Sequence, residues 1–397
     1  MINELKIQRV QNFISQHEHE DLYALVLNSK KYPDIPVKLA IDQINSRRKA
    51  KKKLPEWYAK QGILFPHGVS IEQCSSEATA RYKAGLISGE SLVDLTGGTG
   101  VDSYYMSNSF VQCHLIEQDA LLCAFAHHNL NLLDANNIKI IESDAERYIS
   151  STKSSPDWYY VDPARRDQYN KKVFRLSDCS PNLSKIYNSL LKAKKGVLIK
   201  LAPFLDITQL ITELPDITRI YVIAVNNECK ELVAMVETKG SDELSISAIN
   251  FNDKVQEYQF SYAQEQKAAS QYSQPQKYIY EPNASIMKSG AFKMIGVDFN
   301  LNKLHPNSHL YTSQELVTSF PGRVFQLKGV STLKKNKLPG FEKEKANITS
   351  RNYPMSVRQI RNKTGLNEGG DSYLLATTTL ENSPKILICE KLSFQEF

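Results

Sequence analysis

Hydrophobic and polar residues follow a helical rhythm in the first part of the chain. Apolar positions such as Val10, Phe13 and Ile14 recur at the three- to four-residue spacing of amphipathic helices. Proline at position 33, and again three residues later, interrupts this pattern. We therefore predict an N-terminal helical region over residues 1–72.

Short apolar runs alternate with helix-length segments between residues 73 and 240. The runs are SLVDL, CHLIEQ, IKIIES, DWYYVD, GVLIKL, RIYVIAV and ELVAMVE. Five of them are separated by helix-length stretches, as parallel strands with crossover helices require. Only NNECK separates the last two, which is typical of an antiparallel hairpin. The prediction is an α/β domain with a Rossmann-like, mostly parallel sheet that ends in an antiparallel hairpin.

The last part of the chain contains a polar stretch and then a smaller ordered region. A strand-like LSISAINF leads into residues 262–276, which are rich in Gln and Ser, so we predict a connecting strand and polar linker over 241–278. Ordered patterning resumes with KYIYEPNASIMKSGAFKMIG. The helical SVRQIRNKTG and the strand-like SYLLATTTL and KILICEKL then predict a small C-terminal α+β module.

Length and composition limit the class of protein. A chain of 397 residues is too long for one ordinary core, and 41% hydrophobic and 23% charged residues are typical of a globular protein. The N-terminal MINELKIQRVQNF lacks an apolar signal core and no run of eighteen apolar residues occurs, so we expect a cytoplasmic protein without a membrane span. The six cysteines lack metal-ligand spacing, which predicts reduced thiols and no metal site. The sequence indicates no particular oligomeric state.

The positive charge of the chain is concentrated at its C-terminal end. Residues 321–397 contain 13 Lys and Arg against 7 Asp and Glu, and 13 − 7 equals the +6 of the whole chain. A second basic cluster, RRKAKKK, spans Arg47 to Lys53. Both clusters suit a polyanion such as RNA, and the alternative for either is a solvated helix face.

The glycine-rich LVDLTGGTGVD, residues 92–102, is the first candidate ligand site. A P-loop needs Lys and Ser or Thr after its last glycine, but Val101 and Asp102 follow here. A dinucleotide fingerprint needs GxGxxG, and Asp102 would repel a pyrophosphate at the start of the helix. S-adenosylmethionine (SAM) carries an ammonium group and no phosphate, so Asp94 and Asp102 can face its cationic end. The turn therefore favours SAM.

Further acids follow the next two predicted strands. Glu117, which comes 23 residues after Asp94, is placed to bind both ribose hydroxyls. Asp144 is placed to accept from the adenine amino group, with Ala145 against the ring. Open α/β sheets bind ligands at the C-terminal ends of their strands, where all these residues fall. The predicted cofactor-binding residues are Asp94, Thr96, Gly97, Gly98, Gly100, Asp102, Glu117, Gln118, Asp144 and Ala145.

The chain resembles the class I SAM-dependent methyltransferases, and more closely the bacterial group with a C-terminal THUMP-like domain. The resemblance rests on IEQCSSEATARYKA, LVDLTGGTGVD, YYVDPARRD, NNECKEL and YIYEPNASIMKSGAF. It implies a SAM domain over 73–240, a small ferredoxin-like segment over 279–322 and a THUMP-like domain over 323–397. THUMP domains help RNA-modifying enzymes to bind structured RNA, so the resemblance also implies an RNA partner.

The segment YYVDPARRD is the candidate for the chemical step. It is similar to the (D/N)PP(Y/F) motif of enzymes that methylate exocyclic amines of bases, where the acid and the next carbonyl accept from the target NH2. Asp162 and Pro163 match this motif. Ala164 replaces the second proline, and Arg165 stands where the aromatic ring would be; a guanidinium plane also stacks on bases. We therefore predict catalytic roles for Asp162, Pro163 and Arg165.

DPAR also resembles the DPPR of uracil-C5 methyltransferases, which need a cysteine nucleophile. Cys179 and Cys229 are the nearest downstream candidates, but neither has that family's proline-rich context. Structural roles are expected for both thiols, and also for His127 and His128 in the predicted helix after Glu117.

Several residues near these motifs are candidate substrate-binding groups. Arg166 is predicted to bind a substrate phosphate, and Lys200 and Pro203 of IKLAP to line the target pocket. Glu77 and Lys83 of CSSEATARYKA are predicted to cover the SAM carboxylate end or the substrate entrance. The alternatives are a salt-bridged surface turn for Arg166 and helix capping for Glu77 and its neighbours.

Asn283 and Lys288 of EPNASIMKSG either reach the active site or shape a turn between domains. The sequence leaves that choice open.

Taken together, these patterns predict a SAM-dependent methyltransferase that acts on RNA, with an exocyclic base amine as the favoured acceptor. One alternative is a methyltransferase for a small molecule or a protein, in which case the basic tail is incidental. The other is a non-catalytic RNA-binding protein with a vestigial SAM fold.

Overall fold

The computed structural model describes the whole chain except residues 67, 153, 165–178, 240–242, 334–337, 342 and 395–397. The chain divides into two compact units, which are described separately. The first contains residues 1–217 and 233–240, and the second contains 218–232 and 241–397. Strand β7 (Glu228–Glu237) belongs to both, because the division falls within it.

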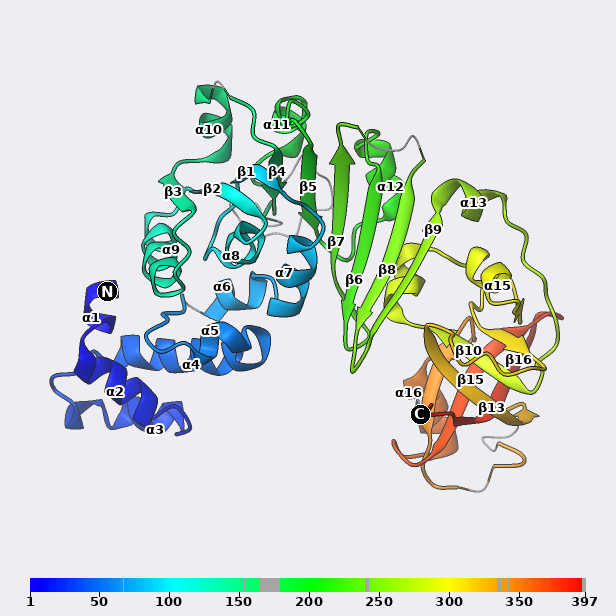
Figure 1. Cartoon of the computed structure of the whole chain (residues 1–397). Helices are drawn as coiled ribbons and strands as arrows, with labels where there is room; N and C mark the ends of the chain where they lie inside the picture. Colours follow the sequence, from blue (N-terminus) through cyan, green and yellow to red (C-terminus); the bar gives the residue numbers. More distant parts are fainter. Residues whose placement is uncertain are drawn as a thin grey trace. The chain divides into compact units, whose positions relative to one another are not determined.

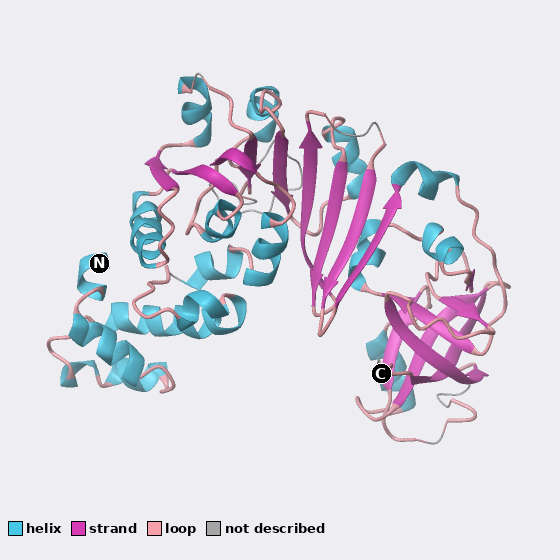
Figure 2. Ribbon diagram, viewed as in Figure 1, coloured by secondary structure: helices cyan, strands magenta, loops and turns pink. Residues whose placement is uncertain are grey.

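The first unit begins with the predicted helical region (Figures 1 and 2). Val10, Phe13 and Ile14 pack against Leu25 and Ile44 in a buried cluster, which explains their helical spacing. The elements are α1 (Ile2–Leu5), α2 (Gln8–Gln16), α3 (Leu22–Leu27), the 3₁₀ helix η1 (Ser29–Lys31), α4 (Val37–Lys53), α5 (Pro55–Ala59), α6 (Gly68–Gln73) and α7 (Glu77–Ala84).

A mostly parallel sheet forms the core of the first unit, as predicted, with hydrogen-bonded order β3-β2-β1-β4-β5-β7. Strands β1 to β5 pair in parallel, so their C-terminal ends share one edge, and the order reverses between β1 and β4. Open α/β sheets bind ligands at such a reversal. The strands are β1 (Gly89–Asp94), β2 (Phe110–Glu117), β3 (Ile138–Glu142), β4 (Trp158–Val161) and β5 (Gly196–Leu201). The helices are α8 (Val101–Ser107), α9 (Ala120–Leu132), α10 (Ala145–Ser151), α11 (Leu183–Leu190) and α12 (Ile207–Glu213).

The second unit begins at the predicted hairpin of β6 (Arg219–Val225) and β7. Asn226 and Asn227 both have positive φ, 51° and 59°, as the two central residues of a tight hairpin turn require. The order continues β7-β6-β8-β9. The segment predicted as one strand and a polar linker contains β8 (Ser245–Phe251), β9 (Val255–Ser261) and α13 (Tyr262–Lys267). β9 buries only Tyr258 and Phe260. Because it has so few buried apolar residues, the hydrophobic pattern of the sequence does not predict this strand.

The remainder of the second unit contains a seven-stranded sheet with order β11-β12-β10-β13-β16-β15-β14. Ile279, Phe325, Leu375 and Leu387 form part of its buried core. The strands are β10 (Tyr278–Pro282), β11 (Asn302–Lys303), β12 (Tyr311–Ser313), β13 (Gly322–Ser331), β14 (Asn347–Arg351), β15 (Ser372–Thr379) and β16 (Ser383–Lys391). The helices are α14 (Ala284–Ser289), α15 (Met294–Asp298) and α16 (Val357–Thr364). The predicted terminal helix and strands are α16, β15 and β16.

Gly97 generates the first prediction, because a Cβ atom there would lie 2.1 Å from Cδ2 of Leu115 on β2. Gly97→Ala is expected to lower the free energy of unfolding by about 1–3 kcal/mol, because Leu115 is fully buried and the hydrogen bond from Gly97 to Ile116 holds the turn against β2. Urea unfolding of the purified protein measures this change.

Gly85→Ala is the matched control, because Gly85 ends α7 with a helical φ of −74° and a Cβ there would make its nearest contact at 3.4 Å. An equal loss of stability in both variants would contradict the steric argument.

Candidate functional site

The glycine-rich turn follows β1 and leads directly into α8. Gly97 donates its backbone N–H to the carbonyl of Ile116 on β2 at 2.8 Å, which draws the turn against that strand. Gly98 and Gly100 have φ of 53° and 84°, a left-handed conformation that favours glycine. The turn thereby lies at the sheet edge where the strand order reverses.

Asp94, the last residue of β1, is 1% exposed. Its carboxylate accepts hydrogen bonds from the Ser103 hydroxyl at 2.6 Å and from the backbone N–H of Thr96 at 2.9 Å. Burial raises the pKa of Asp94 to about 7, although both hydrogen bonds lower it. This carboxyl group therefore titrates near neutral pH.

Glu117, at the end of β2, holds the glycine turn. One carboxylate oxygen accepts from the backbone N–H of Gly98 at 2.7 Å, and the other from the backbone N–H of Asp119 at 2.9 Å. Gln118 beside it is exposed. The carboxylate is half-buried and each oxygen keeps a second lone pair, so Glu117 retains acceptor capacity for a ligand.

Asp144 caps helix α10, and one of its oxygens accepts from the backbone N–H of Arg147 at 2.8 Å. The side chain is exposed, while Ala145 beside it is buried. Asp144 therefore serves as a helix cap, and among the described residues its second carboxylate oxygen accepts no hydrogen bond. A helix cap and a ligand contact are compatible at this position.

Asp162 follows β4 and joins the same turn. Its backbone N–H donates to the Thr96 hydroxyl at 2.7 Å, and that hydroxyl donates to Asp94 at 3.3 Å. The Lys200 ammonium on β5 lies 2.5 Å from an Asp162 carboxylate oxygen. Lys200 is buried, whereas the Asp162 side chain is 31% exposed and therefore accessible. Pro163 is buried next to it.

Asp102, the second acid of the turn, has a partner within the chain. The fully buried Lys83 ammonium lies 3.2 Å from one carboxylate oxygen, and Ser75 and Tyr160 donate to the other, each at 2.8 Å. Burial raises the pKa of Asp102. Lys83, the nearby Lys200 and the two hydroxyl groups together lower this pKa by more, so it lies below the ordinary value for an aspartate. Asp102 thus connects α8 with α7 and β4.

Tyr160 and the serines 75 and 103 were not predicted as site residues. Ser75 lies in IEQCSSEATARYKA and Tyr160 in YYVDPARRD, but neither motif singles these residues out, and Ser103 directly follows the glycine-rich segment. Only their position relative to Asp94 and Asp102 reveals their role. Among the predicted substrate residues, Pro203 lies half-buried just after β5, whereas both oxygens of Glu77 are used by the backbone N–H of Glu56 and by Arg81.

Arg165 and Arg166 lie outside the described residues. The described segment stops at Ala164, whose backbone N–H and C=O both bond to Ser180. The roles given to the two arginines stay predictions.

Cys229 and the EPNASIMKSG motif make hydrogen bonds within the fold of the second unit. Cys229 donates its thiol to the carbonyl of Ala284 at 3.2 Å, and burial raises the pKa of its thiol to about 11, which disfavours the nucleophilic thiolate. Asn283 caps α14 and bonds to Gln256 on β9. Within the second unit, Asn283 thus shapes the junction between the strands and α14. All six cysteines lie in the described part of the chain, and each is a free thiol there.

The basic segment Arg47–Lys53 is largely used inside the first unit. Arg47 pairs with Glu18, Arg48 donates to backbone carbonyls, and Lys49 and Lys53 both bond to Glu72. Lys51 lies over a tyrosine ring, and Lys52 is exposed. Most cations of this cluster therefore have partners inside the first unit, which weakens the prediction that the cluster binds RNA.

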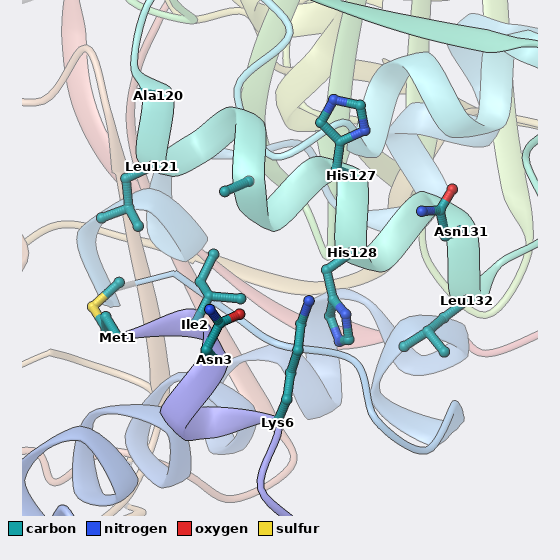
Figure 3. A pocket seen from close by; sticks show the side chains of 11 residues that line it. Met1, Ile2, Asn3, Lys6, Ala120, Leu121, His127, His128, Asn131 and Leu132 are labelled. Carbon is teal, nitrogen blue, oxygen red and sulfur yellow. The ribbon is translucent and has the colours of Figure 1, made fainter.

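A hollow of about 830 Å³ lies between α1 and the outer face of α9 (Figure 3). Figure 3 shows His128 and Lys6 turned toward one another across it, and His128 also bonds to the carbonyl of Gly62 at 2.9 Å. None of the acids at the glycine turn lines this hollow. His128 is therefore held by the backbone of Gly62, whereas His127, which also lines the hollow, is exposed; both lie apart from the acids of the glycine turn.

Among the described residues, no group of three or more His, Cys, Asp or Glu side chains is arranged to hold a metal ion. Within the same part of the chain, no helix is both long and apolar enough to cross a bilayer.

The Lys83–Asp102 pair generates the second prediction. Lys83→Met leaves a buried carboxylate without its cation and is expected to cost about 3–5 kcal/mol of unfolding free energy. Because the pKa of Asp102 is lowered in the fold, this stabilisation is present above the ordinary carboxyl range and is lost as the pH falls through the folded pKa. Urea unfolding at several pH values measures both effects.

Lys83→Met/Asp102→Asn serves as the control, because it removes both charges together. A double variant as unstable as Lys83→Met alone would show that packing, and not the charge pair, explains the loss.

Comparison with known proteins supports the methyltransferase fold. Residues 278–321 match a ferredoxin-like domain, and residues 322–391 match a THUMP domain-like family. No curated protein matches the sequence. The solved structure of a "putative methyltransferase" from Porphyromonas gingivalis W83 is 29% identical, covers 97% of this chain and 98% of its own, and superposes with a TM-score of 0.86.

A SAM-dependent methyltransferase from Agrobacterium tumefaciens matches more locally, with 17% identity, a TM-score of 0.33, and coverage of 45% of this chain and 66% of its own. An rRNA methylase from Streptococcus thermophilus gives 13% identity and a TM-score of 0.30 over 41% of this chain and 95% of its own. The Porphyromonas gingivalis structure and the THUMP domain-like match, and not these local matches, show that the chain as a whole has the fold of a class I SAM-dependent methyltransferase with a C-terminal THUMP-like domain.

Proposed function

We propose that the protein is a SAM-dependent methyltransferase that modifies RNA, with an exocyclic base amine as the favoured acceptor. One observation carries this proposal: acids from three adjacent strands, Asp94, Glu117 and Asp162, are hydrogen-bonded to the same glycine turn. They lie at the carboxyl edge of the sheet, where the strand order reverses. Such a set of acceptors suits a ligand with hydroxyl and ammonium groups.

The acceptor groups present fit SAM part by part. Glu117 has acceptor capacity for the two ribose hydroxyls, and the exposed oxygen of Asp144 for the adenine amino group. Asp94 supplies negative charge near the ammonium end when it is ionised. Asp102, already paired with Lys83, is assigned the role of holding the start of α8 in place. When bound, SAM supplies an activated methyl group, so alignment is the main task left to the protein.

Asp162 and Pro163 are assigned to the acceptor. Lys200 occupies one carboxylate oxygen of Asp162, and Thr96 holds its backbone N–H, so the other oxygen has a defined direction. That oxygen and the Pro163 carbonyl can both accept from an N–H donor, and two acceptors fix the plane of an amino group. Lys200 is thus a positioning residue, because it acts on the acceptor through Asp162.

A small-molecule or protein acceptor is the second candidate, favoured by the internal pairing of most cations in Arg47–Lys53. Salt dependence separates the two. If the protein contacts about five phosphates of single-stranded RNA, the plot of log affinity against log salt concentration has a slope of about −3.5. For a neutral small acceptor we expect almost no salt dependence.

Methyl transfer tests the proposed activity. Labelled SAM is incubated with total RNA from cells that lack this protein, and wild type is compared with Asp162→Ala. We expect label in one RNA size class with wild type and at least a hundredfold less with the variant, because alignment of the acceptor is lost (on the order of 3 kcal/mol). Unchanged SAM binding by the variant is the control.

Nucleoside digestion of the labelled class identifies the modified base. If the protein binds SAM tightly but no label enters RNA, the acceptor would be a small molecule or a protein instead. Equal label with both proteins would exclude Asp162 from the chemical step.

The pKa of Asp94, about 7, gives a prediction about ligand affinity. A cationic ligand end favours the ionised carboxylate, so the affinity for S-adenosylhomocysteine is expected to rise as the pH increases from about 5.5 to about 7, below the range where α-amino groups titrate. Calorimetry measures this affinity. Asp94→Asn cannot ionise, and it is expected to bind more weakly with little pH dependence. A wild-type affinity that falls with pH would place the ammonium elsewhere.

A further inference from the structure

Two arginines of the second unit share one buried acid. Glu281 on β10 is 2% exposed. One of its oxygens accepts from Nε of Arg323 at 2.8 Å and also from Nη2 of the same guanidinium. The other oxygen accepts from Nε and Nη2 of Arg351, each at 3.4 Å. A single carboxylate thus fixes two guanidinium groups next to each other.

The arrangement depends on the curvature of the seven-stranded sheet. Glu281 and Arg323 are direct partners across β10 and β13, but Arg351 ends β14, three strands beyond β13 in the hydrogen-bonded order. The next residue, Asn352, bonds to His305 and Ser308 in the β11–β12 connection, at the opposite end of that order. The sheet therefore curls until its two ends meet, and Arg351 reaches Glu281 at that closure.

This cluster holds more positive charge than the buried acid needs. One cation balances Glu281, so the second guanidinium leaves a net charge of +1. The side chains of Arg323 and Arg351 are 36% and 37% exposed, and among the described residues neither Nη1 group donates a hydrogen bond. Both guanidinium groups are therefore paired with a buried acid and still open to a ligand from solution.

One further cation, Lys303, lies near the cluster. Its ammonium is 3.5 Å from Nδ1 of His309. Burial lowers the pKa of His309 to about 4, and Lys303 and Arg351 also lower it, so this ring is neutral at pH 7. Lys303 itself is buried and donates to the carbonyl of Pro306 at 2.8 Å. Glu281 is the only acid that the described residues pair with either arginine.

We propose that Arg323 and Arg351 form a binding site for a phosphate group of the RNA backbone. Guanidinium groups bind phosphate oxygens through paired N–H donors, and Glu281 holds both groups in place before binding, which reduces the entropy lost on contact. The acid comes from the segment that matches the ferredoxin-like domain, and the arginines from the segment that matches the THUMP domain-like family. The choice of RNA as the source of the phosphate rests on the proposed function.

Fluorescence anisotropy of the full chain with a labelled RNA hairpin tests this site. Arg323→Gln/Arg351→Gln is expected to weaken binding about tenfold or more, and to reduce the slope of log Kd against log salt by about 1–2, as the loss of one or two phosphate contacts requires. Arg351→Gln alone leaves Arg323 paired with Glu281 and therefore preserves the fold; it is expected to show a smaller loss. Thermal melting shows that each variant is folded.

Lys328→Gln/Lys391→Gln is the matched control. It removes the same charge from the neighbouring strands β13 and β16, where Lys328 pairs with Glu390 at 3.0 Å. We expect a change of less than about threefold, because exposed surface cations contribute little individually. An equal loss in both double variants would overturn the site in favour of a diffuse charge effect.

Two further results would also overturn the proposal. Wild-type affinity and salt slope in a folded Arg323→Gln/Arg351→Gln variant would show that the arginines only close the sheet. Arginine-dependent stabilisation by inorganic phosphate, without RNA binding, would assign the site to free phosphate. The binding assay contains no SAM and does not depend on catalysis. It therefore tests the arginine site even if no methyl transfer to RNA is found. SAM binding by the arginine variants is expected to equal that of wild type.

Discussion

Two lysine–aspartate pairs hold four charges at the carboxyl edge of the first sheet, and the candidate site depends on them. Lys83 with Asp102, and Lys200 with Asp162, place cations of very low exposure against acids that face the glycine turn. Removing a charge from water costs several kcal/mol unless a partner and further hydrogen bonds satisfy it. Each pair therefore tolerates only a narrow range of geometries, and this restricts where α8, β4 and β5 can lie.

This constraint explains why the turn has little freedom. Thr96 links Asp94 to the backbone of Asp162, and Glu117 holds Gly98, so β1, β2 and β4 are tied together by side chains as well as by the sheet. Gly97 brings the turn against β2, because any side chain there would collide with Leu115. A ligand that binds at this edge meets acceptors whose directions are already set, which favours alignment over rearrangement.

The second unit uses charge in a different way. Glu281 is as buried as Asp94, but its two arginine partners remain about one third exposed. In the first unit the cations are buried and the acids face the turn, whereas here the acid is buried and the cations face solvent. We propose that the first arrangement offers acceptors to a ligand and that the second offers donors to an anion. In this proposal the two units bind opposite kinds of ligand group.

The sequence by itself determined the helical N-terminal region, the mostly parallel sheet with its terminal hairpin, and the acids at the strand ends, because period and turn chemistry are local properties. It did not reveal β9, whose surface positions resemble a linker. Only the tertiary structure decided which charges pair. Lys200 and Asp162 are separated by 38 residues, and Arg351 and Glu281 by 70. No local pattern encodes such partners, since strand order and sheet curvature bring them together. For the same reason, Arg47–Lys53 looks like an RNA-binding cluster in the sequence, but folding supplies most of its cations with partners inside the first unit.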